Sequence, residues 1–552
     1  MTPESFFKRV QRWVWASAPW VAAAAILAGG VAMRMAALPA SALVEYDTWG
    51  WLKPALEWAG GGGFRENAER EWLYAAFLAG CFRLFGSVDS VVWVQMAAGL
   101  AAGGLLFAAW LAWSRLLPAR VVTRAAALCG GLFVLAAYVG NPNLIAFEMA
   151  LRPESLLVST GLMAIFCGTL YSIERWKNGA TWRSVAFGLP IPVLAGMIAT
   201  FKPSWALALP VIGLPVVAGV LGRVGSFPRR VIPLAGGCLL AVVLVVLPDK
   251  LLFQKSSEPR LVLPMTLLTI HADAVVSAMH KRLAAGGYPA GEREIIASAL
   301  PVLEADLAAA RANPYNYRRL GFDPDYIMYR AGIFPFLINR YGYTRAQLAA
   351  FCHAGYRDAW RYEPGMMLGK AATQLGFLAF PDGRTYSKKR VDLQALTRHT
   401  LDVAPKSLDE SFGGPVRAMW AAYRERSEAA AARQREIRPW KALDKFLRER
   451  MPPAVAMGAL VFLVAVLSWV LPLLRPLRGA GLLAIFYAAV PLGNAFTVAF
   501  VHALDNDRYR MTYGPFVVLA ITAAAVLAVA AVELALRAVI GRIPNRPRGL
   551  EK

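Results

Sequence analysis

Two carboxylates, Glu45 and Asp47, follow directly on a long apolar segment, in the stretch LVEYDTWGWLKPALEW at residues 43–58. An unpaired carboxylate at the edge of a lipid bilayer is costly, so such a group usually marks a binding site or a pathway. A carboxylate placed there can accept the proton of an attacking hydroxyl as a general base. Asp47 also has a structural alternative, because aspartate often caps a helix and one is predicted to begin near Thr48.

Charged and polar side chains recur in five short stretches between apolar segments. They are Glu45, Asp47, Arg70, Glu71, Glu148, Arg152, Glu154, Lys202, His502, Asp505, Asp507 and Arg508. Fixed arginine and lysine donors stabilise a phosphate that gains negative charge as it departs. Acids and cations together therefore suit the transfer of a sugar from a phosphate to a hydroxyl. These stretches are predicted to face away from the cytoplasm, where no nucleotide sugar is expected. The sugar donor is therefore expected to be a lipid.

Each of these residues also has a structural alternative. Arg152 and Glu154 lie at a predicted helix start, where an acidic residue suits the helix dipole. Lys202 could extend its ammonium group toward the outer headgroups. The residues of the last stretch could pair with one another. Two of them, Asp505 and Asp507, could bind a divalent cation, although two carboxylates alone are weak support for a metal site.

The composition is that of a membrane protein. The chain has 552 residues, 57% of them hydrophobic and 17% charged, and its mean hydropathy is +0.44. A soluble domain has roughly 25% charged residues. The net charge of +23 is explained by basic cytoplasmic loops and anionic headgroups, so no nucleic-acid partner is expected. The five cysteines have no metal-binding spacing and predict no disulfide framework.

Apolar runs predict an all-α polytopic protein with about ten transmembrane helices. The first run, 19–38, is interpreted as a membrane span rather than a cleaved signal peptide. Lysines and arginines between the spans place both termini in the cytoplasm, in a bacterial inner membrane, with the polar stretches facing the periplasm. One segment, 366–380, would break this alternation if it crossed the membrane alone.

The chain is expected to contain three parts. They are a membrane module of about seven helices at 1–253, a mainly helical periplasmic domain at 254–452, and a module of about three helices at 453–552. The first outer loop, 39–87, is expected to carry the catalytic residue. Its segment 71–86 is too short to span comfortably and is predicted to be a helix lying in the membrane interface.

The first outer loop resembles that of the GT-C superfamily of membrane glycosyltransferases. The resemblance lies in DTWGWLKPALEWAGGGGF and the following REWLYAAFLAGCFRLFG, through Asp47, Thr48, Trp49, Ala55, Leu56, Gly60 to Gly63, Arg70 and Tyr74. The later stretches ALRPESLL, TFKPSW and DNDRYR are similar to short outer turns of that superfamily. The resemblance covers mainly the first seven helices and the last outer turn.

This resemblance implies an inverting single displacement from a polyprenyl-phosphate-sugar donor, with Asp47 as the base. The candidates for binding the donor phosphate and substrate are Lys202, Arg508, Arg152, Arg70, His502 and Tyr509. The supporting acids are Glu45, Glu154, Asp505 and Asp507. The acceptor would be a glycan, a lipid or a protein, and membrane lipids are further partners. No cofactor or metal ligand is assigned, although a divalent cation stays an option.

Two other functions compete with the glycosyltransferase prediction. A lipid or solute transporter or flippase would place its site near the bilayer midplane, on broken helices and often within repeats. The chain has no duplicated half, and most of its charges lie at helix ends, apart from Arg34 within the first span. A membrane anchor for the polar domain would need neither ten helices nor a set of clustered acids and bases.

Overall fold

The computed structural model confirms an all-α polytopic protein. It describes residues 3–38, 41–222, 224–314, 317–330, 332–379, 391–404, 412–449, 454–505 and 507–540, without the side chains of 3–16, 444, 448–449, 454–457, 507 and 540. Among these residues the strands are confined to β1 (Val391–Asp392) and β2 (Glu436–Ile437), which pair antiparallel. Helices therefore position every candidate side chain.

The helical elements follow one another with short connections. The first half contains α1 (Pro3–Met35), η1 (Tyr46–Thr48), α2 (Trp49–Ala59), α3 (Trp72–Phe85), α4 (Ser90–Ser114), α5 (Val121–Val139), α6 (Pro142–Met149), α7 (Glu154–Asn178), α8 (Trp182–Gly188), α9 (Pro190–Phe201), η2 (Pro203–Trp205), α10 (Ala208–Leu221), α11 (Phe227–Ala241), the π-helical η3 (Val242–Val246) and α12 (Leu247–Leu251). The second half contains α13 (Val262–Ile270), α14 (Ala272–Ala284), α15 (Ala290–Ala312), α16 (Pro324–Tyr329), α17 (Ile333–Tyr341), α18 (Arg345–Tyr362), α19 (Pro364–Ala379), α20 (Leu393–Val403), α22 (Gly414–Ala431), α23 (Lys441–Glu449), α24 (Ala454–Val470), η4 (Pro472–Leu477), α25 (Arg478–Val501) and α26 (Asp507–Ile540).

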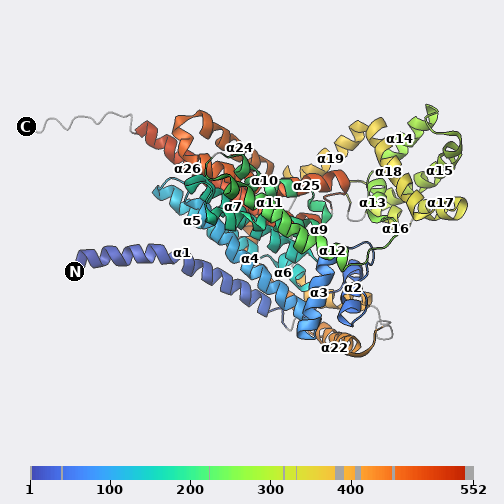
Figure 1. Cartoon of the computed structure of the whole chain (residues 1–552), viewed down its shortest axis with the longest axis horizontal. Coiled ribbons are helices and arrows are strands. Elements are labelled where there is room, and N and C mark those ends of the chain that lie inside the picture. The colour runs from blue at the N-terminus through green and yellow to red at the C-terminus, as the bar shows by residue number, and fades with distance from the viewer. Residues whose placement is uncertain are drawn as a thin grey trace, which may run out of the picture.

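Eight helical segments of the described chain are long and apolar enough to cross a membrane. They correspond to eight of the expected spans, and the other two are shorter: α10 has 14 residues and α24 has 17. A ninth candidate, α13 with α14, is bent by 80° and falls in the predicted periplasmic domain. Figure 1 shows that α1 begins and α26 ends at the same end of the bundle, whereas α2, α22 and α13–α18 lie at the other end.

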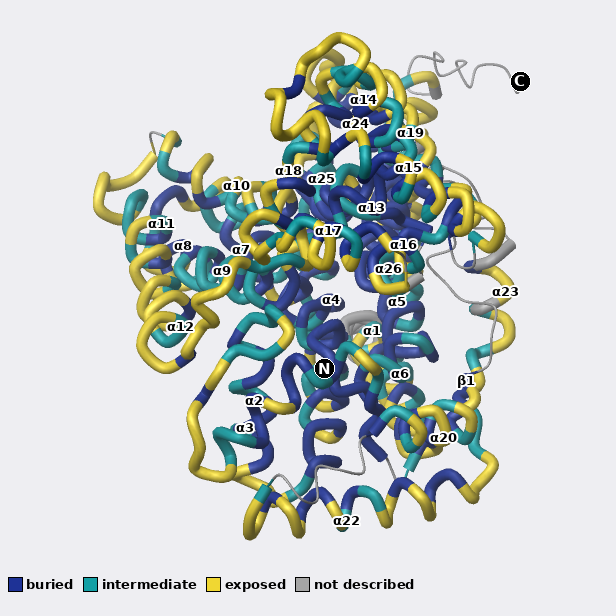
Figure 2. Tube along the Cα trace, turned by 90° about the vertical axis from the view of Figure 1, so that its right-hand side faces the viewer, coloured by how far each residue is buried: buried dark blue, intermediate teal, exposed yellow. Residues whose placement is uncertain are grey.

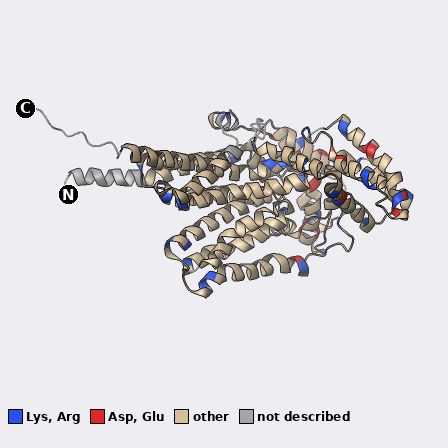
Figure 3. Cartoon of the chain, turned by 90° about the horizontal axis from the view of Figure 1, so that it is seen from above, with Lys and Arg blue, Asp and Glu red and all other residues tan. Residues whose placement is uncertain are grey.

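Close packing of the long helices makes a rigid base for the polar end. α4 packs along α7, and α26 packs against both α5 and α25. Figure 2 shows much of α4, α25 and α26 buried, while yellow, exposed segments gather on the outer helices. The charges follow the same division, since acidic side chains lie mainly at the end that carries the outer helices (Figure 3). The polar stretches predicted from the sequence therefore gather at one end of the bundle.

The predicted 254–452 domain consists of two parts that pack differently. Helices α13–α18 bury an apolar core of their own, with Leu268 and Leu303 fully inside. In contrast, α20 and α22 pack into the core of the membrane module. The hydroxyl of Tyr423, on α22, donates to the carbonyl oxygen of Ala42 at 2.7 Å. The chain after α19 therefore covers the first outer loop from the side, which the hydropathy pattern did not indicate.

Three local features were not predicted from the sequence. The stretch 140–154 was expected to be a loop, but it contains α6, because Asn141 caps the helix by accepting from the amide of Asn143 at 3.0 Å. The segment 366–380 lies mostly in the 16-residue α19, which packs against α25. Cys352, in the polar block, is fully buried. None of the five cysteines forms a disulfide, as predicted.

Candidate functional site

Backbone pairing fixes the position of the first outer loop. The amide of Leu43 donates to the carbonyl of Met149, and the amide of Leu151 donates back to Leu43, each at 2.9 Å. From the other side, the amide of Val44 donates to the hydroxyl of Thr400 on α20 at 3.3 Å. These bonds hold the loop beside the segment that leads to Arg152. Acids from the first loop and a cation from the start of α7 are thereby brought together.

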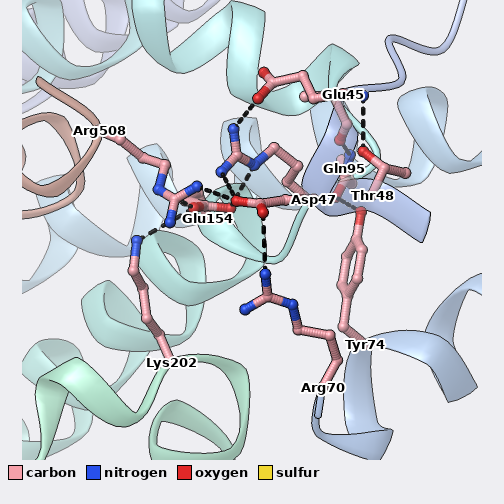
Figure 4. A network of polar contacts seen from close by, with 11 residues as sticks. Glu45, Asp47, Thr48, Arg70, Tyr74, Gln95, Glu154, Lys202 and Arg508 are labelled. Atoms are coloured by element: carbon pink, nitrogen blue, oxygen red, sulfur yellow. Dashed lines mark hydrogen bonds and ion pairs between the residues drawn. The ribbon is translucent and has the colours of Figure 1, made fainter. Parts of the chain in front are cut away.

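The Asp47 carboxylate lies among three guanidinium groups (Figure 4). Its oxygens are 2.5 Å from Arg508, 3.0 Å from Arg70 and 3.4 Å from Arg152. The side chain of Asp47 makes no hydrogen bond that caps α2, so the described contacts do not support a helix-capping role for this residue. Burial alone would raise the pKa of Asp47, but the positive charges of the three arginines outweigh it and lower the pKa. Asp47 is therefore ionised, with 36% of its side chain exposed.

The sequence around Asp47 explains how Arg70 reaches it. A Cβ atom at Gly50 would lie 2.3 Å from Cγ of Arg70, so the side chain can cross α2 there because the residue is glycine. The guanidinium group of Arg70 also lies over the ring of Trp51, 4.9 Å from its centroid. The run DTWGW thus supplies the carboxylate, the gap and the aromatic support.

Arg152 is the buried centre of this cluster. It pairs with Glu45 and lies 3.4 Å from Asp47 and 3.5 Å from Glu154. Its side chain is only 4% exposed, whereas Arg70 and Arg508 are 27% and 26% exposed. Contact with three carboxylates makes Arg152 a group that holds the acids in place. The more exposed Arg70 and Arg508 are better placed to meet a ligand.

Glu154 joins the cluster to Lys202. It begins α7, as predicted, and its carboxylate is 3.2 Å from the ammonium group of Lys202 and 3.6 Å from Arg508. The predicted tight turn at Lys202 is confirmed, since this extended residue is all that separates the end of α9 from the start of η2. Burial lowers the pKa of Lys202 to about 8, although Glu154 opposes the shift. A buried lysine with this pKa is still mostly protonated at neutral pH.

Two predicted substrate-binding residues, Tyr509 and His502, line the far side of Lys202. The Lys202 ammonium lies 4.6 Å from the centroid of the Tyr509 ring, and that ring is 4.7 Å from the His502 ring. Burial, followed by the charges of Arg508 and Lys370, lowers the pKa of His502 to about 3, so the ring is neutral. Its Nδ1 accepts from the amide of Ala503 at 2.8 Å. His502 therefore supports Tyr509 rather than adding a charge.

Asp505 lies outside the cluster of Asp47. Its Oδ2 accepts from the backbone amides of Arg319 and Leu320, at 2.7 and 3.1 Å, and so ties the end of α25 to the α13–α18 part. The backbone of Asp507 begins α26, but its side chain lies outside the described residues. Within the described chain, no three His, Cys, Asp or Glu side chains gather as a metal site. The described part of the last stretch therefore divides between structure and site.

Two other predicted acids are also absent from the cluster. Glu148 forms a buried pair with Arg34 on α1, at 2.6 and 2.7 Å. Glu71 pairs with Arg260 at 2.5 Å, on the chain that enters the α13–α18 part. The remaining charged candidates form one network, hereafter the Asp47 cluster, which consists of Glu45, Asp47, Arg70, Arg152, Glu154, Lys202 and Arg508. Four cations face three carboxylates, so the cluster has an excess of positive charge that suits a phosphate.

Sequence reasoning did not assign Gln95, which supports the cluster from below. Its amide nitrogen donates to the carbonyls of Glu148 and Ala150, at 2.8 and 3.0 Å. Its oxygen accepts from the hydroxyl of Tyr74 at 3.1 Å. A single glutamine within the apolar run of α4 was the available signal. Because Gln95 is fully buried, these bonds fix the segment that carries Arg152.

Comparison with known proteins gives two structural matches. The archaeal oligosaccharyltransferase AglB from Archaeoglobus fulgidus, in complex with an inhibitory peptide and a dolichol-phosphate, matches with a TM-score of 0.41 and 10% identity over 97% of this chain. ArnT from Cupriavidus metallidurans, bound to undecaprenyl phosphate, matches with a TM-score of 0.31 and 13% identity over 89% of this chain. This chain covers 53% of the AglB chain and 77% of the ArnT chain. No family model and no curated protein matches the sequence.

Both matches are distant, with 10% and 13% identity. Their TM-scores are below 0.5, so neither match assigns an activity, a donor or an acceptor to this chain. The geometry of the Asp47 cluster is what indicates a function for this chain.

Proposed function

We propose that this chain is an inverting glycosyltransferase that moves a sugar from a polyprenyl-phosphate donor to an acceptor outside the cytoplasm. One observation carries the proposal: the partly exposed carboxylate of Asp47 and the buried carboxylate of Glu154 lie among a larger number of cations at the polar end of a membrane bundle. A base beside a phosphate-binding set is the requirement for this transfer. The lipid part of the donor explains why the site lies at the end of apolar helices.

The reaction follows from the roles of these groups. Asp47 accepts the proton of the acceptor hydroxyl as the hydroxyl oxygen bonds to the anomeric carbon of the sugar. The bond between that carbon and the phosphate oxygen breaks, and the electron pair stays on the phosphate. Arg508 and Lys202 stabilise this growing negative charge. Attack from the face opposite the leaving phosphate inverts the anomeric configuration.

Asp47 already pairs with Arg508, the cation that the donor phosphate needs. Arg508 lies 2.5 Å from Asp47 and 3.6 Å from Glu154, so the donor phosphate must share or replace these contacts. When Arg508 turns to the phosphate, Asp47 loses an opposing charge, and its pKa rises toward the value of an ordinary carboxylate. A stronger base is then available only when the donor is present. This coupling limits proton transfer in the empty enzyme.

The cluster favours transfer over transport. A transporter places its substrate site near the bilayer midplane. Here the charged groups come from the ends of α7, α9 and α26 and from the first outer loop. Figure 3 shows few charges along the middle of the helices. A flippase would need a polar path through the middle of the helical bundle.

We place the protein in the inner membrane of a bacterium, with the Asp47 cluster in the periplasm and both termini in the cytoplasm. Since Cys352 is buried, the test uses new cysteines at exposed positions, Ile338→Cys on α17 and Lys177→Cys at the end of α7. An impermeant thiol reagent on intact spheroplasts should label the first and spare the second. The reverse pattern would overturn the orientation.

The function itself is tested by turnover of Asp47→Asn with a polyprenyl-phosphate sugar. The amide keeps the shape of the side chain but cannot take the proton, so turnover should fall by roughly 10²–10⁴-fold. Glu57→Gln is the matched control, because Glu57 lies on α2 and pairs only weakly with Lys53, at 3.9 Å. Near-normal turnover by a folded Asp47→Asn protein would move the base elsewhere, with Glu45 the next candidate.

A further inference from the structure

Two neighbouring residues of the first outer loop, Ala68 and Glu69, have a backbone conformation that residues with side chains rarely adopt. Their φ angles are 49° and 58°, and among the described residues they are the non-glycine residues with positive φ. The amide of Arg70 donates to the carbonyl of Asn67 at 3.2 Å, which closes a turn over them. A tight turn with two positive φ angles is of the I′ type, for which Asn-Gly is a preferred sequence. The pair Ala-Glu is strained there, so contacts outside the turn must hold it.

The contacts that hold the turn come from the outer α13–α18 part and meet the Glu69 carboxylate. One carboxylate oxygen accepts from the amide of Leu261 at 2.6 Å, and the other accepts from the amide of Val262 at 2.8 Å, where α13 begins. The guanidinium group of Arg345, on α18, lies 2.7 Å from the first oxygen. Amides at a helix start have no partner within the helix and attract negative charge. Glu69 is therefore bound on three sides by the outer part.

Two other acids, Glu66 and Glu71, fasten the same loop at either side of the turn. Both pair with Arg260, on the chain that leads into α13, at 2.7 and 2.5 Å. Glu69 differs from them because it is itself one of the two strained residues. Its contacts therefore hold the shape of the turn, whereas those of Glu66 and Glu71 hold its ends.

Arg70 follows directly on this turn and extends to the proposed base. Its guanidinium group lies 3.0 Å from the Asp47 carboxylate (Figure 4). Because the arginine side chain is long and has many rotamers, the place that it reaches depends on where the backbone directs it. A change of backbone conformation at Ala68 and Glu69 would redirect Arg70. The described contacts of Glu69 are with the outer part and not with Asp47, so Glu69 acts on the site through Arg70.

We propose that Glu69 is a positioning residue, which holds the left-handed turn against α13 and Arg345 and thereby places Arg70 beside Asp47. The inference rests on the proposed function and gives the α13–α18 part a role in it, because this part supplies the partners of Glu69. Without the Glu69 carboxylate, the turn relaxes to a conformation that alanine and glutamate favour. The guanidinium group of Arg70 then moves away from Asp47, although every group of the Asp47 cluster is still present.

The test measures transfer from a polyprenyl-phosphate sugar, per folded molecule, together with hydrogen exchange of residues 64–71 in the full-length protein. Glu69→Ala should lower kcat/KM by roughly 10-fold to 10²-fold, which is the loss that a small displacement of a group at the reacting centre can cause. Glu69→Gln keeps the shape and one acceptor oxygen, and it should lower kcat/KM by roughly threefold to tenfold. Hydrogen exchange of 64–71 should be faster in both variants.

Two further variants distinguish positioning from a general loss of stability. In an Arg70→Ala background, Glu69→Ala should cause no further loss of turnover, because both changes remove the same contact with Asp47. Ala68→Asn combined with Glu69→Gly introduces the pair that adopts this turn without an outside partner. This double variant should recover most of the turnover that Glu69→Ala loses, and its exchange of 64–71 should be slow again.

Glu304→Ala is the control, because Glu304 is an exposed acid of the same outer part whose partner is His280. Unchanged turnover in Glu69→Ala, an equal further loss in the Arg70→Ala background, or no recovery with the Asn-Gly pair would overturn the role of Glu69. Absence of transfer by the unmodified protein would instead overturn the proposed function. Exchange of 64–71 would still report whether Glu69 holds the turn, so the two failures are distinguishable.

Discussion

Two of the protein's arginine–carboxylate assemblies lie only a short stretch of chain apart, and they differ in whether they leave room and charge for a ligand. In the first, Arg34 grips Glu148 through two bonds of 2.6 and 2.7 Å, with both side chains nearly fully buried. In the second, the Asp47 carboxylate contacts three arginines, and its side chain is 36% exposed. Both came from the same kind of sequence signal, a charge at the end of an apolar helix.

The two assemblies differ in how fully their charged groups are paired and enclosed. A spare donor of Arg34 bonds to the carbonyls of Gly30 and Val139, and a Cβ at Gly99 would lie 2.1 Å from the Glu148 carboxylate. No ligand has room or a free charge there. The Asp47 cluster has more cations than acids, and two of those cations reach solvent. A fully paired and buried set such as Arg34 with Glu148 stabilises the fold. A partly exposed set with more cations than acids, such as the Asp47 cluster, can bind an anionic ligand.

The largest effect is expected from breaking the buried pair. Glu148→Gln leaves Arg34 as a buried charge without its counter-ion, which typically costs roughly 3–5 kcal/mol of stability. The double variant Arg34→Met with Glu148→Leu should recover much of this loss, because apolar groups replace the pair. Thermal unfolding in detergent measures both. Transfer activity per folded molecule should be retained in the double variant, and its loss would show that the pair belongs to the site.

The next effect concerns turnover. Arg508→Ala removes the cation nearest to Asp47, which also lies 3.6 Å from Glu154. The kcat should fall by roughly 10²–10³-fold, as for the loss of one transition-state donor. Steady-state kinetics with a polyprenyl-phosphate sugar measure this. Arg426→Ala is a suitable control, because Arg426 pairs with Asp89 at the side of the first loop, away from the cluster. Similar kcat values in both variants would contradict the role of Arg508.

A smaller effect, on stability and not on turnover, is expected at Asp505, in contrast to the acids of the Asp47 cluster. Asp505→Ala removes the acceptor for two backbone amides, so stability should fall by roughly 1–3 kcal/mol. The turnover of the folded fraction should change little. A large loss of kcat without a loss of stability would return Asp505 to the site.

The smallest effect is a pH dependence. Lys202 must carry its proton to bind a phosphate, and burial lowers its pKa to about 8 from the ordinary value of 10.5. Affinity for polyprenyl phosphate should therefore decrease as the pH rises through about 8. Lys202→Arg should remove this decrease, because arginine stays protonated, although its planar group fits the position less well. Titrations of both proteins between pH 6.5 and 9.5 decide this, and an equal alkaline decrease in both would exclude Lys202.

The location of the site was predictable from the sequence, whereas its partners were not. Asp47, Arg152, Glu154, Lys202 and Arg508 meet because all of them lie at or next to helix ends on the same face of the bundle. A position at a helix end does not determine where a side chain points, so the pairing of Glu148 with Arg34 and the bonds of Asp505 to the outer part were missed. These contacts join residues more than a hundred positions apart.

The fold shows the same limit. Apolar length predicted the helices that include the eight candidate spans, because the bilayer sets that length. The polar block after α12 has no such constraint, and hydropathy did not separate α13–α18 from the elements around α22. That separation depends on which apolar faces fit together, such as Trp420 against Trp49 at 5.7 Å.

The most direct test of the central claim is the affinity of the protein for a polyprenyl phosphate, measured for the unmodified chain, Asp47→Asn and Arg508→Ala at one salt concentration. If the cluster binds the donor phosphate and Asp47 competes for its cations, Asp47→Asn should bind roughly fivefold to tenfold more tightly, because it removes a repelling charge. Arg508→Ala should bind more weakly. Unchanged affinity in both variants, with both proteins folded, would show that the phosphate binds elsewhere.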